Sequence, residues 1–202
     1  MGTDVSSPLR TSLFESASLW FRRARASLLE AIPCGRACCE CCIGIFPITR
    51  LDAQELRRGL DALDPTQREA IVARATNQVG LIEASYPSLR STPCLDEWAD
   101  STLDAIAEQF ADLPCPALGT DGSCLVYASR PITCRTMGIP TESNGMVEGA
   151  CTVQTAVPII RLSHSLQAES VRLAEYEAAA LFVAGQVQSQ RGDELLLPYG
   201  FL

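Results

Sequence analysis

Cysteine is the residue type in this sequence that is best suited to chemistry. The chain has 202 residues, of which ten are cysteines, and five of these fall between positions 34 and 42. Thiols of this kind bind soft metals, pair as disulfides or pack as small apolar groups. Packing alone is a poor explanation for five cysteines in nine residues. The density therefore favours metal ligation by thiolates, with a disulfide framework as the competing interpretation.

The first cluster has a spacing that suits metal ligands. Four of its cysteines follow the pattern C-x3-C-x2-C-C: Cys34, Cys38, Cys41 and Cys42. Ligands this close along the chain can converge on one metal centre, and Gly35 supplies backbone freedom for a tight loop. Adjacent cysteines usually point in different directions, so Cys41 and Cys42 serve two centres, or one is a ligand and the other a packed thiol. Cys39 is an additional cysteine inside the spacing.

The second cluster begins about 70 residues later, where Cys115 and Cys124 flank an Asp121-Gly122 pair. Asp-Gly is a turn signal, so we expect this turn to bring the two cysteines together. Cys134 and Cys151 complete the set. The isolated Cys94 is interpreted as a packed thiol.

Two arginines flank Cys134 in the run Arg130-Pro131-Ile132-Thr133-Cys134-Arg135. Four thiolates around zinc or an oxidised four-iron cluster leave a net negative centre. Guanidinium groups nearby would offset that charge and donate to sulfur. Arg130 and Arg135 are therefore predicted to assist cofactor binding.

Helices are predicted on both sides of the first cluster and after the second. Apolar residues at helical spacing predict an amphipathic helix over residues 9–32, ended by Pro33. A second helix is predicted to start at Asp52, with Asp52 and Glu55 as a capping-box-like pair, and to reach about Leu63. The last helix is predicted over residues 165–188.

Two further helices are predicted between the clusters. Asp64-Pro65 predicts a helix start that leads to a helix ending near Pro87. Asp96, with Glu97 in the first turn, predicts a helix reaching about Ala111. Helical periodicity disappears between residues 114 and 151, and the apolar tail, residues 195–202, is predicted to dock on the core.

The predicted fold is mainly α: a helical domain with an irregular, metal-stapled, cysteine-rich segment. We expect one domain over residues 1–202. Its metal-binding region spans residues 30–151, between flanking helices 9–32 and 165–188. Metal binding would order the irregular segment and add folding free energy.

Composition limits the classes of partner. The formal net charge is −8, which repels phosphate backbones, so no nucleic-acid partner is expected. The N-terminal residues lack a basic start and an apolar run, and no stretch is apolar enough to span a bilayer. These features predict a protein of the reducing cytoplasm, with no membrane span and with an unidentified protein or redox partner.

The ordered motifs together carry a family resemblance. C-x3-C-x2-C-C, then P-C-P-x-L-x3-G-x-C, then R-P-x2-C-R resembles the YkgJ-type cysteine-cluster family, which is also described as a zinc- or iron-chelating domain. The resemblance covers about residues 30–151 and implies eight metal ligands: Cys34, Cys38, Cys41, Cys42, Cys115, Cys124, Cys134 and Cys151. The sequence departs from the family pattern at Cys39, where the family more often has a small residue such as glycine.

Two functions follow from the residues and the resemblance. The first is an iron–sulfur protein with a redox, modification or maturation role, whose cofactor would be an iron–sulfur cluster such as 4Fe-4S. The alternative is a zinc-stabilised structural or interaction module without catalysis. The single histidine, His164, is interpreted as a capping or surface residue, and no catalytic residue is assigned.

Overall fold

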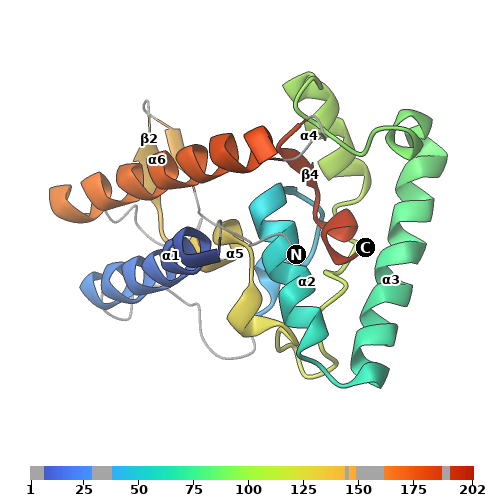
Figure 1. Ribbon diagram of the computed structural model, residues 1–202, viewed down its shortest axis with the longest axis horizontal. Helices are drawn as coiled ribbons and strands as arrows, with labels where there is room; N and C mark the ends of the chain where they lie inside the picture. Colours follow the sequence, from blue (N-terminus) through green and yellow to red (C-terminus); the bar gives the residue numbers. More distant parts are fainter. Residues whose placement is uncertain (1–6, 29–37, 144–145, 149–161, 188–191) are drawn as a thin grey trace. The chain divides into compact units, whose positions relative to one another are not determined.

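The computed structural model describes residues 7–28, 38–143, 146–148, 162–187 and 192–202. Its contacts divide the chain into two compact units. Unit 1 comprises Met1–Glu40 and Ile132–Ser189, and unit 2 comprises Cys41–Pro131 and Gln190–Leu202. Helices dominate both units, and the strands form two-stranded sheets (Figure 1). The mainly α prediction is therefore confirmed.

Unit 1 is built on two long helices that pack side by side, α1 (Ser7–Ser27) and α6 (His164–Val187) (Figure 1). The buried residues of α1 recur at helical spacing, as expected from the sequence, and Leu28 directly after the helix is also buried. Those within α1 are Leu13, Phe14, Ala17, Trp20 and Ala24. The Trp20 indole N–H donates to the carbonyl of Leu166, at 2.9 Å, and Arg23 pairs with Glu169. These contacts fasten the two helices together.

Helix α1 is described as far as Ser27, and the Leu28 N–H is shared between the carbonyls of Ala24 and Arg25. The predicted end of this helix at residue 32 lies outside the described residues. Pro33 lies outside the described residues. Unit 1 also contains the short helix α5 (Ile132–Thr136) and a hairpin of β2 (Thr141–Ser143) with β3 (Met146–Glu148).

Unit 2 contains the helices α2 (Arg50–Asp61), α3 (Pro65–Ser85) and α4 (Asp100–Gln109), with 3-10 turns η3 (Pro87–Arg90) and η4 (Tyr127–Ser129). The start of α3 is the predicted one. The Asp64 carboxylate accepts from the N–H groups of Thr66 and Gln67, at 2.9 and 3.1 Å, and Pro65 occupies the first turn.

The predicted starts of α2 and α4 are wrong. The cap of α2 is Thr49, whose extended backbone directs its hydroxyl to the Asp52 N–H, while the Asp52 carboxylate accepts from the Thr49 N–H. Glu55 instead pairs with Arg58. Helix α4 begins at Asp100, because the Asp96 carboxylate accepts hydrogen bonds from the tail of the chain rather than from a helix end.

The C-terminal tail docks in the core of unit 2, as predicted. Strand β4 (Glu194–Leu196) pairs antiparallel with β1 (Pro47–Thr49), with Ile48 opposite Leu195. The following turn η6 (Leu197–Phe201) is buried throughout. Phe201 packs in one apolar cluster with Leu56 and Ile71, and Tyr199 packs in another with Ile82 and Ile106. The tail thereby fixes α2 against α3.

None of the helices in the described ranges is long and apolar enough to cross a membrane.

Candidate metal centre

The end of the first cysteine cluster and the beginning of the second meet in unit 2 through the backbone. The segment that carries Cys41 and Cys42, in the 3-10 turn η2 (Glu40–Cys42), leads into Ile43, which forms an antiparallel bridge with Pro114. On either side of this bridge, the Cys115 N–H donates to the Cys42 carbonyl at 2.6 Å and the Gly44 N–H donates to the Leu113 carbonyl at 2.8 Å. Segments about 70 residues apart along the chain are thus held in register.

A tight loop connects Cys115 to Cys124. The N–H of Gly119 donates to the carbonyl of Ser123 at 2.8 Å, and Leu118 forms a bridge with Cys124. The Asp121 carboxylate accepts from the N–H and hydroxyl of Ser123, and Gly122 has a φ of 77°, which favours glycine. The predicted Asp121-Gly122 turn is therefore present, and the loop folds back on itself.

The environment of Cys115 opposes its charged form in the metal-free chain. Burial raises the pKa of this thiol to about 12, and charges on Cys124 and Cys41 act in the same direction. The N–H of Ala117 and the guanidinium of Arg74 oppose the rise. Burial thus favours the protonated thiol of Cys115 in the absence of metal, and metal binding there would release a proton.

Cys124 has a parallel environment. Burial raises its pKa, and a charge on Cys41 raises it further, whereas the Val126 N–H and the Arg130 guanidinium lower it. For both thiols the N–H donor is the backbone of the residue two positions later. Such N–H to sulfur bonds stabilise a bound thiolate. The thiolate forms of Cys115 and Cys124 would thus each have one N–H donor and one nearby guanidinium group.

The family model CxxCxxCC, described as "Putative zinc- or iron-chelating domain", matches residues 33–152, which is more than half of the chain. The chain belongs to this family. No curated protein and no solved structure matched the chain.

The family segment coincides with the metal-binding region predicted from the sequence, residues 30–151, and the predicted resemblance is confirmed. In the CxxCxxCC pattern the last three cysteines correspond in spacing to Cys38, Cys41 and Cys42. Cys34 lies one residue farther from Cys38 than the pattern has it, because Gly35 occupies the matching position. The family description supports cysteine-ligated metal binding and names zinc and iron together.

The predicted family ligands are distributed over both units. Unit 2 contains Cys41, Cys42, Cys115 and Cys124, and all four are half-buried. Unit 1 contains Cys38 and Cys134, which are also half-buried. Cys34 and Cys151 lie outside the described residues.

The donor chemistry of the described site fits a thiolate-bound metal. Its candidate ligands are all sulfur, the donor set that suits zinc and iron–sulfur centres. Within the described ranges, no group of three or more Cys, His, Asp or Glu side chains is gathered closely enough to hold an ion. The ligand set itself stays a prediction. The structure shows backbone register between Cys42 and Cys115.

The two predicted arginines occupy different environments. The Arg130 guanidinium lies 3.7 Å from the centre of the Tyr127 ring, and its charge lowers the pKa of Cys124. Arg135 is buried in unit 1, where its Nη1 donates to the Ser18 hydroxyl at 2.6 Å. The charge of Arg130 thus acts on Cys124, a ligand candidate. The role of Arg135 in cofactor binding stays a prediction.

Two residues of α3 beside Cys115 were missed by the sequence analysis, namely Arg74 and Gln78. Their side chains bind the carbonyls of Pro116 and Pro114, 42 and 36 residues farther along the chain. No local pattern in the sequence signals contacts at such separations.

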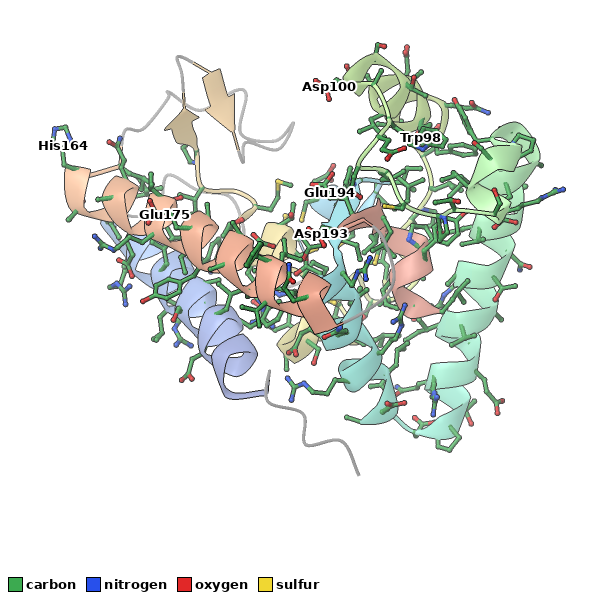
Figure 2. All side chains as sticks on the ribbon, turned by 45° about the horizontal axis from the view of Figure 1, so that its top comes forward. Trp98, Asp100, His164, Glu175, Asp193 and Glu194 are labelled. Carbon is green, nitrogen blue, oxygen red and sulfur yellow. The ribbon has the colours of Figure 1, made fainter. Side chains whose placement is uncertain are left out.

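The contacts described for Cys94 and His164 involve none of the candidate metal ligands. The Cys94 thiol is half-buried and donates to the Asp96 carboxylate at 2.6 Å. Figure 2 shows His164 at the end of α6, where its side chain is exposed. The cap of that helix is Ser163, whose hydroxyl accepts from the Leu166 N–H. His164 is thus a surface residue, one of the two roles predicted for it.

Proposed function

We propose that this protein holds a cysteine-ligated iron–sulfur cluster and serves a redox, modification or maturation role in the cytoplasm. The observation that supports the proposal best is the backbone arrangement in unit 2. There the Cys115 N–H donates to the Cys42 carbonyl at 2.6 Å, Leu118 forms a bridge with Cys124, and the cations of Arg74 and Arg130 act on Cys115 and Cys124. A cluster bound by thiolates is net negative, and such cations stabilise it.

The proposed ligands are the eight cysteines of the family pattern. Four of them belong to unit 2, which is the number of ligands that one tetrahedral sulfur site or one cubane cluster requires. The remaining candidates, Cys34, Cys38, Cys134 and Cys151, would then serve a second centre. A bound cluster would supply one-electron transfer, and the cysteine surplus over a single structural site favours this use.

The protein's own residues have defined tasks in this proposal. The Ala117 and Val126 N–H groups donate to the sulfurs of Cys115 and Cys124. The guanidinium of Arg74 offsets negative charge at Cys115, and that of Arg130 offsets it at Cys124. An unidentified redox partner would exchange electrons with the centre.

The alternative is a zinc-stabilised structural or interaction module without catalysis. The feature that favours it is the single histidine of the sequence, His164, with which no Ser-His-Asp or H-E-x-x-H arrangement can be built. A tetrahedral four-cysteine site is the common structural form of zinc.

Cysteine variants with a matched control test the proposal. Cys115→Ser and Cys124→Ser are each purified without oxygen and analysed for iron, sulfide and zinc per chain. Cys94→Ser is the control, because this thiol has a similar half-buried position but pairs with Asp96. We expect the first two variants to lose more than half of the bound metal and the control to keep it. Equal metal content in all three would contradict the ligand assignment.

A further inference from the structure

The Pro114–Cys115–Pro116 tripeptide has few backbone hydrogen-bond donors. Proline has no backbone N–H, so the tripeptide offers one N–H donor, that of Cys115, and this donor is used by the Cys42 carbonyl at 2.6 Å. The tripeptide's carbonyls on both sides of Cys115, those of Pro114 and Pro116, accept hydrogen bonds from side chains.

Helix α3 supplies both donors from side chains one turn apart. Gln78 Nε2 donates to the Pro114 carbonyl and Arg74 Nε donates to the Pro116 carbonyl, each at 2.7 Å. Residues at positions i and i+4 lie on the same side of a helix, so one face of α3 binds the loop by two hydrogen bonds. Ile71 and Ala75, which are fully buried, hold that part of the helix in the core.

Gln78 has a further feature that points to a specific task. Its side chain is only 7% exposed, and its Oε1 atom has no hydrogen-bond partner among the described residues. A buried acceptor without a donor costs roughly 1–3 kcal/mol. An apolar side chain of similar length would avoid this cost, so the contribution of the amide at this position lies in its bond to the Pro114 carbonyl.

We infer that Arg74 and Gln78 are positioning residues of the metal centre, which fix the loop of Cys115 against α3 so that its sulfur is held ready for a metal. The inference rests on the proposed metal binding and adds two residues to it. Arg74 also brings a positive charge to the Cys115 loop, where it would stabilise the net negative centre that bound thiolates form. Outer residues that orient metal ligands typically contribute about 10–100-fold to metal affinity.

Substitutions that retain the fold can separate these effects. Gln78→Met removes the donor to Pro114 and also the buried oxygen that lacks a donor, so the two stability changes partly offset each other. Arg74→Gln removes the charge, whereas Arg74→Lys keeps it without the fixed guanidinium geometry. The control is Arg68→Gln, which removes the same charge from α3 at an exposed side chain that pairs with Asp61.

Zinc affinity is measured for each variant by competition with a chromophoric chelator, and the absorption of the cobalt-loaded protein reports ligand geometry. In the metal-free protein, hydrogen exchange at the Cys115 amide reports how firmly the loop is held. We expect Gln78→Met and Arg74→Gln to weaken zinc binding about 10–100-fold, to alter the cobalt spectrum and to speed exchange at Cys115. Arg74→Lys should recover part of the affinity, and Arg68→Gln should match the wild type.

The outcomes distinguish this inference from the proposed function. If the wild type binds metal and the Gln78 and Arg74 variants bind it equally well with an unchanged cobalt spectrum, the positioning role is overturned and metal binding stands. An equal loss in Arg68→Gln also overturns it, since the effect would then be the general charge of α3. If the wild type binds no metal, the proposed function fails and the positioning role fails with it, whatever the exchange at Cys115 shows.

Discussion

Individual side chains in this protein have roles that depend on partners far along the chain. The turn at Asp121-Gly122 could be predicted from two adjacent residues, because its hydrogen bonds are local. The hydrogen bonds from Arg74 and Gln78 to the cysteine loop could not be predicted, since those contacts arise only when α3 packs beside the loop. Asp96 was misassigned for the same reason: its carboxylate accepts from the tail N–H groups of Asp193 and Glu194, about 97 residues away.

Asp96 gives a pH-dependent prediction. Burial would raise its pKa, but hydrogen bonds from the Cys94 thiol and from the tail N–H groups outweigh burial and lower it. A lowered carboxyl pKa contributes stability that is present above its ordinary value of about 4 and is lost as the pH falls through the folded-state value. Asp96→Asn should therefore lower the free energy of unfolding by about 1 kcal/mol at pH 7. The deficit relative to wild type should shrink below about pH 4.

Urea unfolding of wild type and Asp96→Asn at pH 7, 5 and 3 measures this difference. Glu97→Gln is the control, because it removes an exposed carboxylate from the neighbouring position. A deficit that stays constant over the whole pH range would show that the charge of Asp96 has no part in holding the tail. Figure 2 shows Asp193 and Glu194, the tail residues that Asp96 binds, together at the start of β4.

Helix boundaries could be predicted where their signals are local. The start of α3 is fixed by Asp64 and Pro65, which are adjacent in sequence. The start of α2 depends instead on Thr49, the last residue of β1, whose extended conformation is set by pairing with β4. Because that strand pairing joins distant residues, the sequence pattern gave the cap to Asp52 in place of Thr49.

Two helical glycines provide a matched test of helix packing. A Cβ at Gly59 on α2 would lie 2.5 Å from the Ser129 Cβ in η4, whereas a Cβ at Gly80 on α3 would meet nothing within 4 Å. Gly80→Ala should stabilise the protein by roughly 0.5–1 kcal/mol, because alanine loses less backbone entropy than glycine in a helix. Gly59→Ala should destabilise it by about 1–3 kcal/mol through overpacking.

Thermal or urea unfolding of both glycine variants checks the comparison. Stabilisation by both substitutions would contradict the close approach of α2 to η4. Destabilisation by both would contradict the open surroundings of Gly80.

The whole molecule consists of two units. Unit 1 contains a pair of long helices, and unit 2 contains the cysteine loops and a core into which the C-terminal tail packs. The mainly α fold and the docked tail could be predicted from periodicity and from the apolar C-terminus. The division of the cysteines between units could not be predicted, because it depends on how α5 and α6 pack with α1. The expectation of one domain over residues 1–202 stays a prediction.

The most direct test of the central claim is purification of the wild-type chain without oxygen, followed by its visible spectrum and analysis for iron, sulfide and zinc. We predict broad sulfur-to-iron absorption with iron and sulfide in equal amounts, about four of each per cubane cluster. Stoichiometric zinc in a colourless protein that takes up no cluster on reconstitution would favour the structural module. A protein that binds neither metal, with its thiols paired as disulfides, would contradict the account.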